Sequence, residues 1–567
     1  MRKWLRRTLF VAILAALLVT WWQARRGPSI PSGSYVVLSL AGSYPDVAPD
    51  HFLARVFLPR EATLFEVLLD LRKAKVDPRI RGIVLRIGSL EIGWGKAAEL
   101  RQAVVDFRKS GKLAVALIEQ EFTPGNMAHF IASACDRVYL VPGSSAPLSG
   151  LAANYLFFGG VWEKLNIEMT VEKRAEYKTA GDMIANKAMT PAHREMANSI
   201  LDSLSAEFFE GLALSRSVSV DRLKQIVETE APSAAEELVA HGIIDGSQHW
   251  EELRQELGGK DARFTDEATY RRVPPEAVGL QTGPTVALIF AAGQIVTGES
   301  RRTPSGMLLG ADTIREALQR AAENELVRAI VVRVDSPGGS ALASEMIWRT
   351  VREAAKAKPV VVSMSDVAAS GGYYASVGAT KIVAQPTTLT GSIGVVLARP
   401  AIAGFLDRLG IHAETIARGR FATLDDVTTS LDAAQKARLG EEVDRTYQLF
   451  LQRVAEGRGL AFANVQEVAR GRVWTGAQAL ANELVDRLGG LFDAVELTKE
   501  LAGIPREQEV RLLVIPPPQG LWTQVEEMVT RKAHSLLPLP VREALSTLPA
   551  ATQAGPFTLL PYAIDVR

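Results

Sequence analysis

Short apolar runs alternate with segments of helical periodicity along most of the chain, and the same succession of elements occurs twice. In each half, three apolar runs are typical of buried strands, and a segment with one apolar helical face lies between the second run and the third. The runs are residues 35–42, 80–87 and 113–118 in the first half and 286–293, 327–334 and 360–364 in the second, and the helical segments are 97–109 and 343–356. This alternation predicts an α/β fold around mostly parallel sheets.

A fixed offset between the two halves indicates an internal duplication. Residues 135–138 lie 244 positions before residues 379–382, and no gap is needed between residues 125 and 182. Further pairs at the same offset (386 − 142 = 244) are Pro142 and Pro386, Gly150 and Gly394, Thr179 and Thr423, and Asp182 and Asp426. We therefore predict two tandem copies of one α/β unit.

The duplication suggests a division of the chain into five parts. The two α/β repeats are predicted at residues 28–257 and 285–502, with a linker at 258–284. Residues 1–27 form the predicted membrane anchor, and residues 503–567 form a Pro-rich tail. One amphipathic segment of the tail, residues 521–537, could pack on the body, on a neighbouring subunit or on a membrane surface, and packing is favoured.

The N-terminal segment has the pattern of a single membrane span. The basic residues that precede it are Arg2, Lys3, Arg6 and Arg7. The uncharged stretch at residues 8–24 is mostly apolar and reaches about 24 Å as a helix, close to a bilayer core when flanking residues snorkel. A cleaved signal peptide is the alternative, but bulky Trp22 stands where a cleavage site needs a small residue. We therefore expect an uncleaved transmembrane helix. Four basic residues precede it and two follow it, so the bulk of the chain should lie outside, which in a bacterium is the periplasmic side of the inner membrane.

The composition of the chain limits the kinds of partner and cofactor that it can be expected to bind. Lys and Arg together number 64, as do Asp and Glu, so the chain lacks the basic excess typical of nucleic-acid binding. Cys135 is the only cysteine, so no intrachain disulfide can form. The seven histidines are scattered and none has metal-ligand spacing. We expect no nucleic acid, no metal and no cofactor.

Ser370 is the first candidate for chemistry. It follows the third apolar run of the second half and immediately precedes Gly371 and Gly372. The pattern predicts a strand ending near residue 364, a turn of small residues, and a helix that begins after Ser370. Such a position exposes a hydroxyl beside backbone N–H donors, as a serine nucleophile requires, although on its own it is more often a helix cap.

The 244-residue offset shows that the two copies differ at the candidate residues. Asn126 stands at the position equivalent to Ser370 (126 + 244 = 370), and Ala422 stands at the position equivalent to Lys178 (178 + 244 = 422). Each copy lacks what the other retains, which favours one active site built from both copies over drift at two surface positions. Since the ordinary pKa of lysine is about 10.4, Lys178 would need burial to act as a base near neutral pH.

Two turns rich in glycine and serine accompany these residues. Residues 335–339 (DSPGG) end the second apolar run of the second half, and residues 389–394 read LTGSIG. Glycine lets backbone N–H groups come close to a ligand oxyanion, although each pattern is also common in ordinary loops.

Together these motifs resemble the signal peptide peptidase A family in its long, duplicated form. The motifs are EYKTA (176–180), DSPGG (335–339), AASGGYY (368–374), LTGSIG (389–394) and GRVWTGAQALANELVD (471–486). The resemblance covers about residues 35–500 and leaves out the tail. It implies tandem domains of the Clp-protease and crotonase-like fold group and a serine endopeptidase that degrades cleaved signal peptides.

The resemblance also implies roles for individual residues. Ser370 would be the nucleophile, Lys178 the general base, and Ser392 the residue that orients the lysine. The N–H groups of Gly339 and Gly371 would form the oxyanion hole. Peptide substrates, a membrane location and a bowl-shaped homotetramer are further implications.

Two other functions stay open on the sequence. A crotonase-like acyl-thioester enzyme would share the backbone oxyanion hole but would not need Ser370 or Lys178. A non-catalytic membrane scaffold could keep the same fold, although the complete set of motifs favours the peptidase.

Overall fold

The computed structural model describes residues 28–47, 62–121, 123–303, 306–515, 557–559 and 565–566. The predicted anchor at residues 1–27 and the amphipathic segment at 521–537 lie outside the described residues. Within the described ranges, no helix combines the length and the apolar character that a membrane crossing requires.

The first repeat is built on a six-stranded sheet in the order β7-β4-β3-β2-β1-β8. All neighbouring strands in it are parallel. The strands are β1 (Ser34–Gly42), β2 (Ile80–Leu90), β3 (Leu113–Ile118), β4 (Arg137–Leu140), β7 (Gly246–Ser247) and β8 (Arg263–Asp266). The helices of this repeat are α3 (Leu64–Val76), α4 (Trp94–Arg108), α5 (Asn126–Ala132), α6 (Gly159–Leu165), α7 (Ala180–Ala185), α8 (Pro191–Arg216), α9 (Val220–Thr229), α10 (Ala235–Ala240), α11 (Trp250–Glu256) and α12 (Glu267–Arg271).

The second repeat repeats this strand order. Its sheet runs through β15, β13, β9 and β21, with β16 and β20 continuing beyond β15. The strands are β9 (Thr285–Ala292), β13 (Val327–Ser336), β15 (Val360–Ala369), β16 (Lys381–Ala384), β20 (Arg487–Leu488) and β21 (Arg511–Val514), and two further strands, β17 (Leu389–Gly391) and β19 (Val473–Thr475), extend the sheet beside β15. Its helices are α13 (Ala311–Glu323), α14 (Ala341–Ala357), α15 (Gly371–Ser376), α16 (Ala403–Arg408), α17 (Ala433–Arg458), α18 (Phe462–Val468), α19 (Gly476–Ala481) and α20 (Leu491–Leu501). The prediction of an α/β fold with mostly parallel sheets is confirmed.

The segments predicted as linker and tail each supply a strand to the sheet of the repeat that precedes them. β8, within residues 258–284, pairs with β1, and β21, after residue 502, pairs with β9 in the equivalent place. Both strands are short and lie at a sheet edge, where an apolar run is not needed. Tyr270, which follows β8, is fully buried, so this stretch is part of the packed body.

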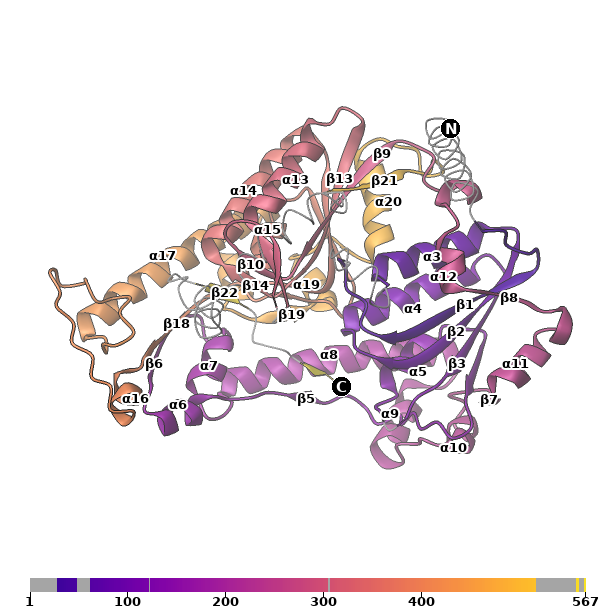
Figure 1. The fold of residues 1–567 in the computed structure, drawn as a ribbon, viewed down its shortest axis with the longest axis horizontal. Helices are drawn as coiled ribbons and strands as arrows, with labels where there is room; N and C mark the ends of the chain where they lie inside the picture. Colours follow the sequence, from indigo (N-terminus) through magenta and orange to yellow (C-terminus); the bar gives the residue numbers. More distant parts are fainter. Residues whose placement is uncertain are drawn as a thin grey trace, which may run out of the picture.

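A third sheet joins the two repeats. Its order is β11-β12-β10-β14-β22-β18-β6, and β6 (Glu168–Arg174) is the member from the first repeat. The others are β10 (Gln294–Val296), β11 (Arg301–Thr303), β12 (Gly306–Gly310), β14 (Gly338–Ser340), β18 (Val395–Ala401) and β22 (Phe557–Leu559). Figure 1 shows β6 and β18 running together away from the body toward α6 and α16. A separate pair of short strands is β5 (Ala153–Asn154) with β23 (Asp565–Val566).

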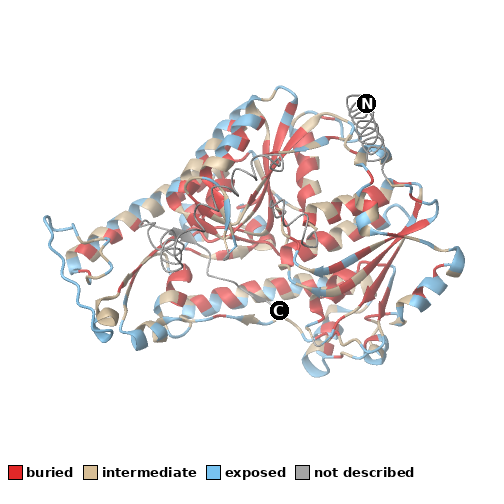
Figure 2. Cartoon of the chain, in the orientation of Figure 1, coloured by how far each residue is buried: buried red, intermediate tan, exposed pale blue. Residues whose placement is uncertain are grey.

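The burial of the central strands explains their continuous apolar sequence. β13 and β15 are almost wholly buried, and both faces of their sheet are covered, one by α13 and α14 and the other by α20. Parallel strands covered on both faces carry continuous apolar runs, as these Val-rich segments do. Figure 2 shows these buried strands at the centre of the second repeat.

One element differs from its prediction. The third strand of the second repeat was expected to end near residue 364 and to be followed by a turn of small residues. β15 instead continues to Ala369, because residues 367–369 pair with residues 389–391 of β17. The strand therefore leads directly into Ser370 with no intervening turn.

Candidate active site

Ser370 occupies a strained position between β15 and α15. Its backbone angles are φ 55° and ψ −114°, and its N–H donates to the Gly391 carbonyl at 2.8 Å. A residue other than glycine in such a conformation costs about 1–3 kcal/mol and persists only where its surroundings enforce it. Here the enforced bend lies between a buried strand and the first turn of a helix, and the Ser370 side chain is fully buried.

Lys178 reaches Ser370 from the first repeat. Its Nζ lies 2.7 Å from Ser370 Oγ, 3.0 Å from Ser392 Oγ and 2.9 Å from the Ser392 carbonyl oxygen. All three residues are fully buried. The structure therefore brings together the two side chains that the offset had assigned to opposite copies. Ser392 contacts the amine through two of its oxygens.

Strand pairing explains why a lysine and two serines so far apart in sequence meet. β6 and β18 are antiparallel, and Arg174 at the end of β6 pairs with Val395 at the start of β18. Lys178 follows β6 by four positions, and Ser392 precedes β18 by three. Because antiparallel pairing places the end of one strand beside the start of the other, it carries Lys178 to Ser392.

Burial sets the protonation of Lys178. Removal from water lowers the pKa of its amine well below the ordinary lysine value. The other buried lysines of the described residues each have a carboxylate partner: Lys73 with Asp70, Lys96 with Asp335, and Lys499 with Glu496. No carboxylate pairs with Lys178 in the part of the chain that the structure describes, so nothing there offsets desolvation and the neutral amine is favoured.

The predicted oxyanion donors lie in adjoining turns. β14, which carries Gly339, contacts α15, which begins at Gly371. Ser336, at the end of β13, pairs with Ala368, and its carbonyl oxygen would lie 2.8 Å from a Cβ placed on Gly372. A Cβ on Gly339 would lie 2.0 Å from the Ile295 carbonyl oxygen, so only glycine fits there.

The equivalent position in the first repeat has a structural role. Asn126 begins α5, donates from Nδ2 to the Gly150 carbonyl at 2.7 Å and accepts from the Ser149 N–H at 3.1 Å. Its amide thus holds the loop that corresponds to residues 392–394. Ala422, the counterpart of Lys178, is exposed.

A further residue, Gly471, was not assigned a role from the sequence although it begins a quoted motif. Its φ is 73°, and a Cβ on it would lie 2.5 Å from the backbone nitrogen of Lys178. Its N–H donates to the Ile393 carbonyl at 2.9 Å, and the preceding Arg470 carbonyl accepts from the Tyr177 N–H at 3.0 Å. Gly471 therefore allows the chain to press against the backbone of the lysine.

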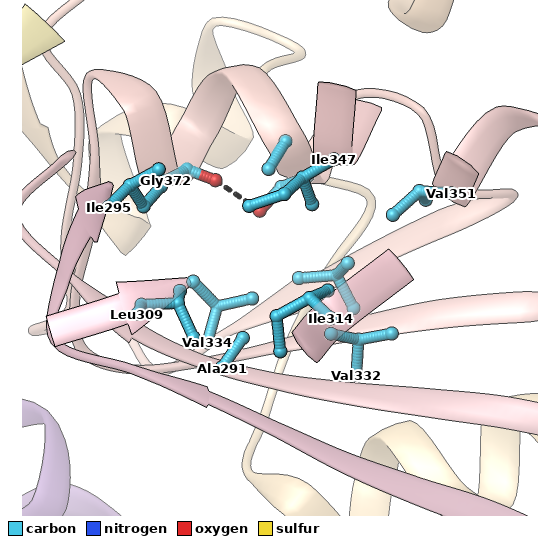
Figure 3. A pocket seen from close by; sticks show the side chains of 12 residues that line it. Ala291, Ile295, Leu309, Ile314, Val332, Val334, Ile347, Val351 and Gly372 are labelled. Atoms are coloured by element: carbon cyan, nitrogen blue, oxygen red, sulfur yellow. Dashed lines mark hydrogen bonds between the residues drawn. The ribbon is translucent and has the colours of Figure 1, made fainter. Parts of the chain in front are cut away.

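A small apolar cavity adjoins the site (Figure 3). Its wall includes Ile295 of β10, Ile347 of α14 and Gly372 of α15, and its volume is about 10 Å³. That space holds about one water molecule or one methyl group. Ile295 pairs with Gly339, and Gly372 lies two positions after Ser370, so the cavity lies beside both.

No cluster of three or more His, Cys, Asp or Glu side chains suited to a metal ion occurs in the described ranges. Ser370 Oγ contacts the Lys178 amine, which in turn contacts the Ser392 hydroxyl, and these groups suit proton transfer to and from a nucleophile.

Comparison with known proteins defines the class. The model of peptidase family S49 matches the chain twice, at residues 106–262 and 352–505. The serine protease SPPA of Arabidopsis thaliana chloroplasts is 34% identical over 519 residues, which cover 90% of this chain and 74% of the relative. Protease 4 of Salmonella typhi is 31% identical over 512 residues (87% and 81%), and Protease 4 of Haemophilus influenzae is 26% identical over 529 residues (88% and 84%).

The chain is thus a serine peptidase built from two copies of one unit. It belongs to peptidase family S49.

The lowered pKa of Lys178 predicts how activity depends on pH. A lysine that serves as general base must be neutral, so with Lys178 in that role kcat/KM should rise as pH rises through the pKa of Lys178 in the free enzyme and should level off well below pH ~10.4, the ordinary lysine value. A pH–rate profile with a peptide substrate checks this, together with the rate of Ser370 labelling by a fluorophosphonate across the same range. A profile that keeps rising to the ordinary lysine pKa would contradict it.

The packing of Gly471 predicts a selective loss of activity. Gly471→Ala should shift Lys178 and lower kcat by about 10-fold or more, because small displacements of a catalytic group are costly. Gly459→Ala is the matched control, since Gly459 also has a positive φ of 65° but would meet nothing within 4 Å. Both variants carry the strain of a positive φ, and Gly471→Ala should lose more thermal stability because its Cβ also meets the Lys178 backbone. Equal kcat values in the two folded variants would refute the assignment.

Proposed function

We propose that this peptidase is a membrane-anchored endopeptidase that degrades cleaved signal peptides with a Ser370–Lys178 dyad. The observation that carries the dyad is the 2.7 Å separation of a buried amine without a carboxylate partner among the described residues from a hydroxyl on a strained bend. An amine held neutral beside a serine hydroxyl can take its proton without a histidine or an aspartate.

The proposed reaction uses the groups in sequence. Lys178 takes the proton of Ser370 Oγ as that oxygen attacks the scissile carbonyl carbon. The N–H groups of Gly339 and Gly371 stabilise the resulting oxyanion. Lys178 then returns the proton to the leaving amine, and the same amine activates the water that hydrolyses the acyl-enzyme. Ser392 holds Nζ in line for each transfer through the contact at 3.0 Å.

Strand pairing supports an extended peptide as substrate. β22 lies between β14 and β18 and is antiparallel to both, with Thr558 paired to Gly339 and Phe557 paired to Val396. The edges of β14 and β18 can therefore hold an extended segment through backbone hydrogen bonds, which is a common mode of peptide recognition. The apolar cavity next to Ser370 suits a small apolar side chain, which fits the apolar character of signal peptides.

The proposal includes assembly and location. Exposed apolar residues gather on the arm beside β6 and β18; they include Leu156, Phe158, Leu409, Ile411 and Ile416. Such a set is more typical of an interface than of a free surface, which supports self-association. That the assembly is a homotetramer is proposed from the family resemblance alone. Residues 1–27 would anchor the chain in a bacterial inner membrane, with the catalytic body on the periplasmic side.

The dyad is tested by replacing its nucleophile. Ser370→Ala should abolish cleavage of a signal-peptide-like substrate, with a loss of about 10³-fold or more, and should abolish fluorophosphonate labelling. Wild-type protein and Ser392→Ala serve as comparisons, since the latter should still be labelled, only more slowly. A Ser370→Ala protein that cleaves peptide normally would overturn the dyad, and turnover of an acyl-thioester without labelling would favour the crotonase-like alternative. A folded wild-type chain with neither activity would favour the non-catalytic scaffold.

The position of β22 predicts that the tail competes with substrate. A chain ending at Ile515 should keep its kcat and lower its KM by a factor of about 3 or more, because the segment between β14 and β18 is removed. Thr558→Pro in the full chain should act in the same direction, since proline removes a backbone donor from a strand. Steady-state kinetics of both variants check this, and unchanged KM values would contradict it.

A further inference from the structure

A group of charged side chains, buried except for the half-buried Asp335 and Asp366, joins the two repeats outside the Ser370, Lys178 and Ser392 site. We call it the inter-repeat cluster. Its members are Asp46, Lys96 and Glu99 from the first repeat and Arg333, Asp335 and Asp366 from the second. Removing so many charges from water at one contact is costly unless each is paired, so their arrangement calls for a physical reason.

Arg333 is the fully paired member. Its guanidinium donates to Asp46 at 3.0 Å and to Glu99, both in the first repeat. It also donates to the hydroxyls of Ser363 and Ser365 of β15 at 2.9 and 3.0 Å. Arg333 therefore fastens β13 and β15 to the first repeat.

Lys96 holds three carboxylates at once. Its Nζ lies 2.7 Å from Asp335, 3.4 Å from Asp46 and 3.5 Å from Asp366. The lysine lies in the first turn of α4, and Asp366 accepts from its backbone N–H at 2.7 Å and from that of Gly93 at 3.0 Å. A carboxylate of the second repeat thus caps a helix of the first.

Two of the carboxylates that contact Lys96 lie shortly before Gly339 and Ser370 in the sequence. Asp335 lies at the end of β13, four positions before Gly339, and it accepts from the Val367 N–H at 3.2 Å. Asp366 lies in β15, four positions before Ser370. The ammonium group of Lys96 therefore contacts both the segment that leads to Gly339 and the segment that leads to Ser370.

The charges of the cluster depend on Lys96. Four carboxylates face two cations, so loss of the lysine would leave four acids against Arg333 alone. Burial, together with Asp46 and Asp366, raises the pKa of Asp335 to about 6 although Lys96 lowers it. Burial also acts to raise the pKa of Asp46, but Arg333 and Lys96 outweigh it and lower that pKa to about 2.

We propose that Lys96 is a positioning residue for peptide hydrolysis: by holding Asp335 and Asp366 together, it aligns the Gly339 turn with Ser370 and makes the geometry of the site depend on contact between the repeats. The inference rests on the proposed roles of Ser370 and Gly339. Lys96 contacts no reacting atom and acts through the two strands.

The test replaces the charge and then restores the balance. Lys96→Met should lower kcat by about 10- to 100-fold with little change in KM, because alignment and not substrate binding is lost. The defect should grow as pH rises through the pKa of Asp335, since the ionised carboxylates then repel one another. Lys96→Met combined with Asp335→Asn should recover most of the lost kcat, because the asparagine amide oxygen can still accept from the Val367 N–H.

Lys73→Met is the matched control. Lys73 is also buried and lies 2.8 Å from Asp70, but both are in α3, and the contacts of its amine lie within the first repeat. Its replacement should lower the melting temperature without changing kcat or its pH profile. If Lys96→Met does not fold, the double variant still decides, because a folded double variant with kcat as low as that of Ser370→Ala would overturn the proposal.

Ser370→Ala run in parallel separates this inference from the proposed function. Peptidase activity in Ser370→Ala would refute the dyad whatever Lys96 does. Inactive Ser370→Ala with a fully active Lys96→Met, or a Lys96→Met defect that does not vary with pH, would refute only the positioning role.

Discussion

The pairing of β6 with β18 is the contact on which the rest of the site depends. Among the described residues it is the one place where a strand of the first repeat joins strands of the second in a sheet, and its register ends at Arg174 and Val395. Without it, no strand pairing would hold Lys178 beside Ser392. An antiparallel ladder fixes register along its whole length, so a slip by one residue would turn the lysine side chain away from Ser392.

Once the amine is delivered, burial determines its chemistry. Lys73, Lys96 and Lys499 show what this fold does with other buried lysines, which is to give each a carboxylate. The Lys178 amine instead contacts two oxygens of Ser392, at 2.9 and 3.0 Å. These oxygens can hold the amine in place without favouring its charged form as a carboxylate would. The cost of keeping this amine without a counterion is borne by the surrounding repeats, in the same way that their packing enforces the backbone angles of Ser370.

Much of this arrangement could be predicted from the sequence. The Val-rich runs predict the central strands because their burial on both faces requires continuous apolar residues, and the 244-residue offset identifies Ser370 and Lys178 by what their counterparts lack. The length of β15 could not be predicted in this way, because residues 367–369 are held by pairing to β17 and not by their own apolar character. The short edge strand β8 (RFTD) has one apolar residue in four, and β21 (RLLV) is only four residues long, so neither gives a clear strand pattern.

Duplication also explains why the ionic contacts lie where they do. Two copies of one fold begin with the same surface, and differences that arise between them allow a contact between two unlike, complementary faces. Arg86 has the same place in IVLRI (83–87) of β2 as Arg333 has in IVVRV (330–334) of β13. Arg86 pairs with nearby Glu119 near the surface, whereas Arg333 is buried and pairs across the repeats. The same divergence that left Ser370 in one copy and Lys178 in the other thus gave one arginine a surface partner and buried the other at the interface. Charge pairs depend closely on the positions of their atoms, so they suit such a contact. An apolar interface of equal area would tolerate small rotations of one repeat against the other, and such rotations would move Lys178 away from Ser370.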